Sequence, residues 1–325
     1  MLKYLKLIRI QNLLMVPLTM YLLRYGVVNS ALYYGYSFAL GQEMELQFSF
    51  GMFNLLIAIN MLLGAAGYVI NDYFDRKIDS INRPNEVIIG NTVHRRFAII
   101  LHWTLNSIAV VMAGYLSWQF RKPMILVAYI MISGIFWLYS TTYKKQFLIG
   151  NIIVALGTAM IPFQLAYFEI QSLIQVYGVD MALKGMSFKV LFYWLAAFAL
   201  FAFLTNLIRE IVKDLEDFEG DASYGCNSIP VVLGTKAAKI IIAGLSLFTI
   251  GLLGYFYYTF IINQISKWYL LVTIVIPLLA VVFLTFNANT VKHYHRISIL
   301  LKIIMLFGVL YSVVTFFLME YLIKL

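Results

Sequence analysis

The sequence is poor in charged residues. Asp, Glu, Lys and Arg make up 12% of its 325 residues, whereas hydrophobic types make up 62%. An average soluble domain is about 25% charged and about 45–50% apolar. A chain with so few charges cannot cover a water-facing surface, so we expect the lipid bilayer to be its solvent.

Cysteine and proline are also scarce. The single cysteine, Cys226, excludes a disulfide within the chain. The six prolines and the scattered glycines do not gather into a low-complexity linker. We therefore expect a single transmembrane domain over residues 1–325, without a separate soluble domain.

Long apolar runs recur along the whole chain. A transmembrane helix needs about 20 mostly apolar residues, and open strands cannot cross lipid because their backbone groups would remain unpaired. The sequence thus predicts an all-α polytopic membrane bundle of about nine transmembrane helices. The first run follows three cations without a signal-peptide cleavage site, so we interpret it as a retained helix. The expected spans cover residues 12–32, 51–70, 97–118, 124–142, 147–166, 187–208, 237–260, 268–286 and 302–322.

The net charge of +9 comes from Lys and Arg residues that lie between the apolar runs. This placement favours membrane orientation and membrane lipid over nucleic acid as the explanation. If the N-terminus is cytoplasmic, 17 of the 24 Lys and Arg residues fall on the cytoplasmic side of the predicted spans. We therefore expect a cytoplasmic N-terminus and cytoplasmic acidic loops, in the cell inner membrane.

Acidic residues gather in two short windows. Ten of the 15 Asp and Glu residues follow either the second span, within residues 72–86, or the sixth, within residues 210–221. The first window reads N-D-Y-F-D-R-K-I-D from Asn71 to Asp79, and the second reads K-D-L-E-D-F-E-G-D from Lys213 to Asp221. Charges close to a membrane core are costly and usually functional. The predicted topology places both windows on the same side.

The spacing within each window is helical. If the second helix continues into the first window, Asn71, Asp75 and Asp79 share one face. In the second window Asp214, Asp217 and Asp221 share a face, provided that Gly220 does not end the helix first. Like charges this close repel each other, so the pattern indicates a divalent cation. Carboxylate and amide oxygens suit Mg²⁺, which completes its shell with waters and phosphate oxygens.

A weak internal repeat accompanies the two windows. Asp75 and Asp217 are 142 residues apart, as are Asp79 and Asp221. The repeat predicts two four-helix units, over about residues 1–145 and 146–286, with a ninth helix at 302–322.

At these residues the chain resembles the UbiA family of intramembrane prenyltransferases. The family motif N-D-x-x-D-x-x-x-D matches residues 71–79 in full, including Asp72, and D-x-x-x-D matches Asp217 and Asp221. The segment from Tyr139 to Asn151 resembles the family's Y-x(n)-K-x(n)-G-N segment. Arg9 and Asn12 match the family's first helix. One departure is that Arg83-Pro84 is not followed by the second Arg-Pro of many members.

The resemblance implies a bundle around a central cavity, Mg²⁺ as cofactor, and an isoprenoid diphosphate and a lipid-soluble acceptor as substrates. It implies a transfer of the prenyl group, with geranylgeranylglyceryl phosphate as the best-matching acceptor. The predicted metal ligands are Asn71, Asp75, Asp79, Asp217 and Asp221, the last four being the predicted catalytic residues. The predicted substrate-binding residues are Arg9, Asn12, Asp72, Arg83, Tyr139, Lys145, Lys213 and Asp214.

Four other functions remain open from the sequence. A soluble isoprenoid synthase also uses aspartate-rich motifs, although the nine predicted apolar spans argue against it. A prenyltransferase of quinone biosynthesis would carry similar motifs but act on an aromatic acceptor such as 4-hydroxybenzoate or dihydroxynaphthoate. A cation-coupled transporter also buries acids in a helical bundle, although it tends to place single acids in mid-helix. A non-catalytic scaffold would have no reason to keep both acidic motifs.

Overall fold

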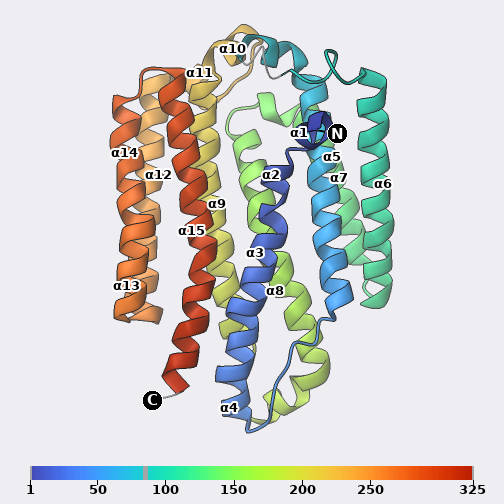
Figure 1. The fold of residues 1–325 in the computed structure, drawn as a ribbon, viewed down its shortest axis with the longest axis vertical. Helices are drawn as coiled ribbons and strands as arrows, with labels where there is room; N and C mark the ends of the chain where they lie inside the picture. Colours follow the sequence, from blue (N-terminus) through green and yellow to red (C-terminus); the bar gives the residue numbers. More distant parts are fainter. Residues whose placement is uncertain (1, 83–86, 324–325) are drawn as a thin grey trace. The chain divides into compact units, whose positions relative to one another are not determined.

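The computed structural model describes residues 2–82 and 87–323 (Figure 1). Its contacts divide the chain into two compact units. Unit 1 combines Met1–Leu18, Ser49–Gly150 and Asp217–Val231, and unit 2 combines Thr19–Phe48, Asn151–Glu216 and Val232–Leu325. These units do not follow the two sequence halves of the predicted repeat, which stays a prediction.

The regular structure of the described residues is helical throughout, without a β-strand. Helices satisfy every backbone group within one segment, which the interior of a bilayer requires. Among the residues that the structure describes, eight stretches are long and apolar enough to cross a membrane, so the predicted all-α polytopic fold is confirmed. They comprise α5 (Phe50–Asn82), α6 (Arg95–Gln119), α7 (Met124–Thr141), α8 (Ile149–Leu183), α9 (Lys189–Glu216), α12 (Thr235–Phe256) with η5 (Tyr257–Ile261), α13 (Gln264–Leu270) with η6 (Leu271–Val275) and α14 (Ile276–Asn287), and α15 (Val291–Ile323).

The first predicted span, residues 12–32, is helical but interrupted. Two π-helical stretches separate its α-helical pieces, because wider turns with i→i+5 hydrogen bonds replace the regular ladder there. No piece alone is long enough to cross a bilayer. The pieces are α2 (Ile10–Leu13), α3 (Met15–Leu23), η1 (Arg24–Asn29), η2 (Ala31–Tyr36) and α4 (Ser37–Leu40).

Unit 1 is built on three long helices, α5, α6 and α7, each of which packs on the other two. Short α1 (Leu2–Leu7) and α2 pack against α5. A side chain in place of Gly64 would put its Cβ 2.9 Å from Leu13 Cδ2, so this glycine allows α2 to approach α5. Leu7 of α1 is fully buried in a cluster with Val69, Val93 and other apolar residues.

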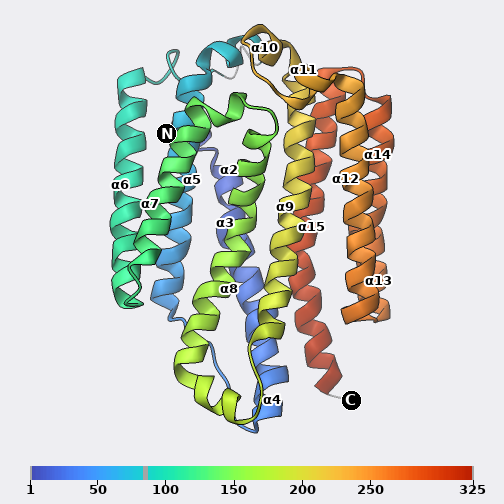
Figure 2. The same cartoon turned by 180° about the vertical axis from the view of Figure 1, so that it is seen from behind.

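In unit 2, α9 packs along α15, and α12 lies against both α9 and α14 (Figure 2). Close approaches again depend on small residues. A Cβ at Gly308 of α15 would lie 2.3 Å from the Phe201 ring, and one at Gly26 would lie 2.5 Å from the Ser312 carbonyl oxygen. Such contacts between helices are typical of membrane bundles, where packing replaces the hydrophobic driving force.

Candidate metal–phosphate site

Helix α5 carries the first acidic window on its last turns. Its 33 residues correspond to about 50 Å of helix, more than the about 30 Å of a bilayer core. The helix continues to Asn82, which confirms that Asn71, Asp75 and Asp79 follow one another at intervals of one turn on one face. Asp75 is buried, with 6% of its surface exposed.

The side-chain oxygen of Asn71 is shielded from solvent and has no hydrogen-bond partner among the described residues. Leaving a buried acceptor unsatisfied costs about 1–3 kcal/mol. A cation bound at this face of α5 would offset that cost. This orphaned oxygen is the structural observation that fits Asn71 to its predicted role as a metal ligand.

Asp72 lies one residue away and faces Arg9. The Arg9 guanidinium donates a 2.8 Å hydrogen bond to the Asp72 carboxylate and lies 5.1 Å from the centre of the Tyr68 ring. Arg9 has a left-handed backbone, with φ 50° and ψ 53°, and its carbonyl oxygen accepts the Asn12 N–H at 2.8 Å. The structure thus brings together Arg9, Asn12 and Asp72, which are three predicted substrate-binding residues. The two charged residues, Arg9 and Asp72, form an ion pair.

The second acidic window is not one continuous helix. Helix α9 ends at Glu216, and the short α10 (Phe218–Ser223) begins after Asp217, whose φ of −97° and ψ of 10° depart from helical values. The expectation that Asp214, Asp217 and Asp221 share a helical face is therefore wrong. The break comes at Asp217, ahead of Gly220, because the chain turns there onto α5.

Helix α10 packs directly against α5, so Asp217 and Asp221 of the second window lie in unit 1 together with the first window. The Gly220 N–H donates a 2.9 Å hydrogen bond to the Asn82 side-chain oxygen. A Cβ at Gly220 would lie 2.3 Å from that same oxygen, so only glycine permits this approach. Asp221 lies close enough to Asp75 of α5 for that charge to raise the pKa of its carboxyl.

A third segment contributes a cation that the sequence did not single out. The 3₁₀ turn η4 (Tyr143–Lys145) follows α7 and directs the Lys144 ammonium onto the Asp75 carboxylate. The predicted phosphate ligand, Lys145, uses its carbonyl oxygen to accept the Asn227 N–H at 2.9 Å. The sequence singled out Lys145 alone, and the geometry of the turn identifies Lys144.

The electrostatic environment of Asp221 reflects this convergence. Burial raises the pKa of its carboxyl to about 6. The neighbouring Ser228 hydroxyl and the Lys144 ammonium lower that pKa, whereas the charges of Asp217 and Asp75 raise it. The Asp221 carboxyl therefore interacts electrostatically with acids from both windows, as expected of carboxylates that would share a cation.

Two predicted substrate-binding residues lie in unit 2. Asp214 accepts a 2.9 Å hydrogen bond from the Asn151 side-chain amide. Lys213 forms an ion pair of 3.0 Å with Glu210, which also pairs with Arg209 at 2.8 Å. Of the remaining candidates, Tyr139 is half-buried on α7, and Arg83 falls outside the described residues.

No three His, Cys, Asp or Glu side chains in the described part of the chain converge closely enough to hold an ion by themselves. This arrangement suits Mg²⁺, which usually takes one or two carboxylates and completes its octahedral shell with water and phosphate oxygens. The donors present are hard oxygens, from Asn71 and the four predicted catalytic aspartates. They fit a metal that is held jointly by the protein and by a phosphorylated ligand.

These features define a multi-pass, all-helical membrane protein with two aspartate segments that meet at one end of a three-helix unit. The sequence profile of the UbiA prenyltransferase family matches residues 28–298. The chain belongs to this family, as its motifs indicate.

Relatives of known name support the same grouping. Digeranylgeranylglyceryl phosphate synthase of Thermococcus kodakarensis is 31% identical over 202 residues, which span 60% of this chain and 62% of the relative. This alignment therefore spans less than two thirds of the relative's length. The synthase of Methanosphaera stadtmanae is 30% identical over 244 residues, which span 74% of this chain and 79% of the relative.

Solved structures share the fold. A structure from work on digeranylgeranylglyceryl phosphate synthase in membranes has a TM-score of 0.61 at 22% identity and covers 97% of both chains. A UbiA homolog from Archaeoglobus fulgidus bound to GPP and Mg²⁺ has a TM-score of 0.52 at 17% identity. It covers 96% of this chain and 99% of the homolog.

Proposed function

We propose that this chain is a Mg²⁺-dependent intramembrane prenyltransferase. It would move a prenyl group from an isoprenoid diphosphate to a lipid-soluble acceptor. The observation that carries the proposal is the hydrogen bond between Gly220 and Asn82, because it joins the end of α5, which carries the first aspartate segment, to α10 in the second. The homolog from Archaeoglobus fulgidus that binds GPP and Mg²⁺ supports the same substrate class and cofactor.

The residues of unit 1 would have the following roles. Asn71, Asp75 and Asp79 from α5, with Asp217 and Asp221 from the α9–α10 break, would hold Mg²⁺. When bound, the metal supplies electrostatic stabilisation of the diphosphate as it leaves. Lys144 lies close enough to the same carboxylates to neutralise phosphate charge. The Arg9–Asp72 pair would fix the first helix beside the site.

The reaction would break the C–O bond between the prenyl carbon and the diphosphate, which leaves with the bonding electron pair. The acceptor hydroxyl would supply the electrons of the new C–O bond and release its proton. Apolar side chains that exclude water would protect the allylic cation from hydrolysis. A membrane interior suits this step, since both substrates carry long apolar chains.

We propose geranylgeranylglyceryl phosphate as the acceptor. This choice is supported by the names of the curated relatives, digeranylgeranylglyceryl phosphate synthases from Thermococcus kodakarensis and Methanosphaera stadtmanae. With an aromatic acceptor, the enzyme would instead catalyse a prenyl transfer of quinone biosynthesis. We also propose that the aspartate end faces the cytoplasm, in line with the 17 of 24 basic residues assigned to that side.

The test is a Mg²⁺-dependent assay of purified protein that pairs several isoprenoid diphosphates with geranylgeranylglyceryl phosphate and with aromatic acids. Asp75→Ala and Asp217→Ala are expected to lose turnover and to remain folded in the membrane. Glu219→Ala is the matched control, because Glu219 is exposed and lies between Asp217 and Asp221. Full activity in either aspartate variant would refute the site, and ion flux in liposomes without prenyl transfer would favour a transporter.

A further inference from the structure

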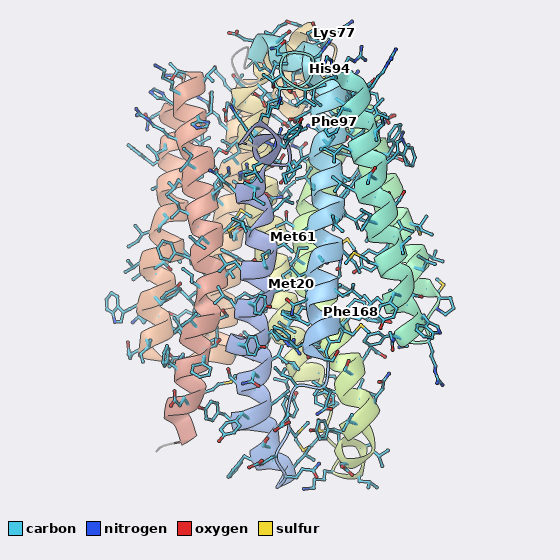
Figure 3. All side chains as sticks on the ribbon, turned by 45° about the vertical axis from the view of Figure 1, so that its right-hand side comes forward. Met20, Met61, Lys77, His94, Phe97 and Phe168 are labelled. Carbon is cyan, nitrogen blue, oxygen red and sulfur yellow. The ribbon has the colours of Figure 1, made fainter. Side chains whose placement is uncertain are left out.

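A cluster of exposed basic side chains lies on unit 1. Lys3 and Lys6 of α1 are exposed, and so are His94, Arg95 and Arg96 at the start of α6. Figure 3 shows His94 and Phe97 one below the other at the end of unit 1 where Lys77 lies. Residues 2–9 and 87–97 contain no Asp or Glu. We name these five basic residues the basic surface.

Contacts between α1 and the start of α6 make the basic surface continuous. The Lys3 ammonium donates a 3.2 Å hydrogen bond to the Thr92 carbonyl oxygen. The Tyr4 ring lies 5.6 Å from the Phe97 ring, centre to centre. Beneath them, Leu7 packs into a buried apolar cluster with Val93 and Ala98. Helix α1 is therefore fixed with its lysines outward.

The stability of the fold does not account for the charges of Lys6 and Arg96. The N-terminus of a helix carries partial positive charge, so Arg95 and Arg96 in the first turn of α6 are unfavourable for the helix itself. Arg95 has a structural partner, since it donates to the Tyr73 hydroxyl at 3.1 Å and lies over that ring. Lys6 and Arg96 are exposed, and their own segments carry no acidic residue. Their charge calls for an anionic partner outside the chain.

The position of the basic surface identifies that partner. Tyr4 and Phe97 are 39% and 43% exposed, and further along α6 Ile100 and Trp103 are 62% and 56% exposed. Apolar residues so open on a membrane helix face lipid, and exposed aromatic rings concentrate where hydrocarbon meets headgroups. The cations thus lie at headgroup level. We infer that the basic surface binds the phosphate headgroups of anionic phospholipids in the surrounding bilayer.

This contact connects to the aspartate end through α1. Only two residues separate Lys6 from Arg9, which pairs with Asp72. Headgroups bound to α1 hold that helix on α5 and so help to keep Arg9 in place. The inference stands on the surface alone and does not depend on the proposed function.

The experiment titrates the purified full-length protein in detergent with phosphatidylglycerol and, separately, with phosphatidylcholine. Bound lipids are counted by native mass spectrometry. The test variant combines Lys3→Gln, Lys6→Gln and Arg96→Gln, and spares Arg95. The control combines Arg121→Gln, Lys189→Gln and Lys267→Gln, three exposed cations elsewhere, with the same loss of charge. Arg96→Gln alone serves as a milder test of the same surface.

One cation near an anionic membrane surface contributes about fivefold in affinity. We expect the wild type to prefer phosphatidylglycerol, the triple variant to lose more than about tenfold of that affinity, and the control to stay close to the wild type. Arg96→Gln alone should lose about fivefold. Equal binding of the two lipids by the wild type, or undiminished binding by both variants of the basic surface, would overturn the inference. Displacement of phosphatidylglycerol by an equal concentration of inorganic phosphate would also overturn it.

Discussion

The Gly220 N–H and the Asn82 side-chain oxygen, 138 positions apart in sequence, form a hydrogen bond of 2.9 Å. Asn82 is the last residue of α5, three positions after Asp79, and Gly220 lies between Asp217 and Asp221. This contact joins the α5 end of the first acidic window to α10 in the second window. Because this contact requires that residue 220 has no side chain, a single methyl group added at Gly220 would disturb it.

Gly220→Ala is expected to destabilise the junction of α5 and α10 and to reduce metal-dependent activity. The new Cβ would lie 2.3 Å from the Asn82 oxygen, and overpacking of this kind costs about 1–3 kcal/mol. The measurement is the thermal unfolding midpoint together with turnover at increasing Mg²⁺.

The matched control is Gly244→Ala, because a Cβ at this position in α12 would meet nothing within 4 Å. The double variant Gly220→Ala with Asn82→Ala removes the atom that clashes. It should regain part of the stability lost by Gly220→Ala alone. If Gly220→Ala behaves like Gly244→Ala, the contact does not set the geometry of the site.

Lys144→Gln is expected to tighten the binding of free divalent metal. The Lys144 ammonium is paired with Asp75 and must be displaced from that carboxylate when a metal approaches. Removing an ion pair of this kind should raise metal affinity about fivefold. Binding of the isoprenoid diphosphate should weaken at the same time, because a cation close to the phosphates is lost.

Mn²⁺ binding followed by electron paramagnetic resonance would measure the first effect, and substrate titration the second. Lys145→Gln is the control for metal affinity, because the Lys145 contact in the structure is made by its carbonyl oxygen. Unchanged Mn²⁺ affinity in Lys144→Gln would show that the ion pair does not compete with the metal.

The raised pKa of Asp221, about 6, predicts a pH dependence. Below that value the carboxyl is protonated, so metal binding should rise as pH increases from about 5 to 7. The folded state holds this proton more tightly than the unfolded state, so the metal-free protein loses stability as pH rises from the ordinary value of 3.8 to about 6.

Asp221→Asn should therefore raise the unfolding midpoint of the metal-free protein at pH 7.5 and abolish Mg²⁺-dependent turnover. The gain in stability should shrink as the pH falls through 6. Glu219→Asn, an exposed carboxylate on the same helix, provides the control. A gain in stability that is equal at pH 5 and pH 7.5 would contradict the assigned pKa.

The sequence predicted one half of this site better than the other. The 3.6-residue period continues without interruption from the apolar part of α5 into its acids, so the register of Asn71, Asp75 and Asp79 could be read directly. The helix break at Asp217 could not be predicted, because residues 213–221 have a good helical pattern. The break depends on how α10 meets α5, a contact between segments far apart in sequence.

The same limit applies to the cations. Arg9 was predicted from its likeness to the family's first helix, but its pairing with Asp72 depends on a left-handed backbone that no local pattern requires. The choice between Lys144 and Lys145 depends on a single 3₁₀ turn. Sequence periodicity reports which face of a helix a residue occupies, and it does not report the direction of side chains in the turns between helices.

A buried ion pair in unit 2 leads to the last prediction. Arg24 and Glu169 are 2.7 Å apart, with 3% and 0% of their side chains exposed, and Arg24 also donates to the Phe48 carbonyl. Phe48 belongs to the non-helical stretch before α5, whose backbone groups need partners inside the protein. Arg24 thus supplies a hydrogen bond to an irregular backbone, and Glu169 balances its charge.

Glu169→Gln is expected to lower the stability of the protein by about 3–5 kcal/mol, because it leaves the buried Arg24 without a countercharge. The double variant Arg24→Met with Glu169→Met removes both charges and should cost less than the sum of Arg24→Met alone and Glu169→Met alone. Thermal unfolding in detergent measures both, with Glu45→Gln, an exposed acid in the same stretch, as the control. If the single-variant costs simply add, the two residues do not act as a pair, and Arg24 is held by the Phe48 carbonyl alone.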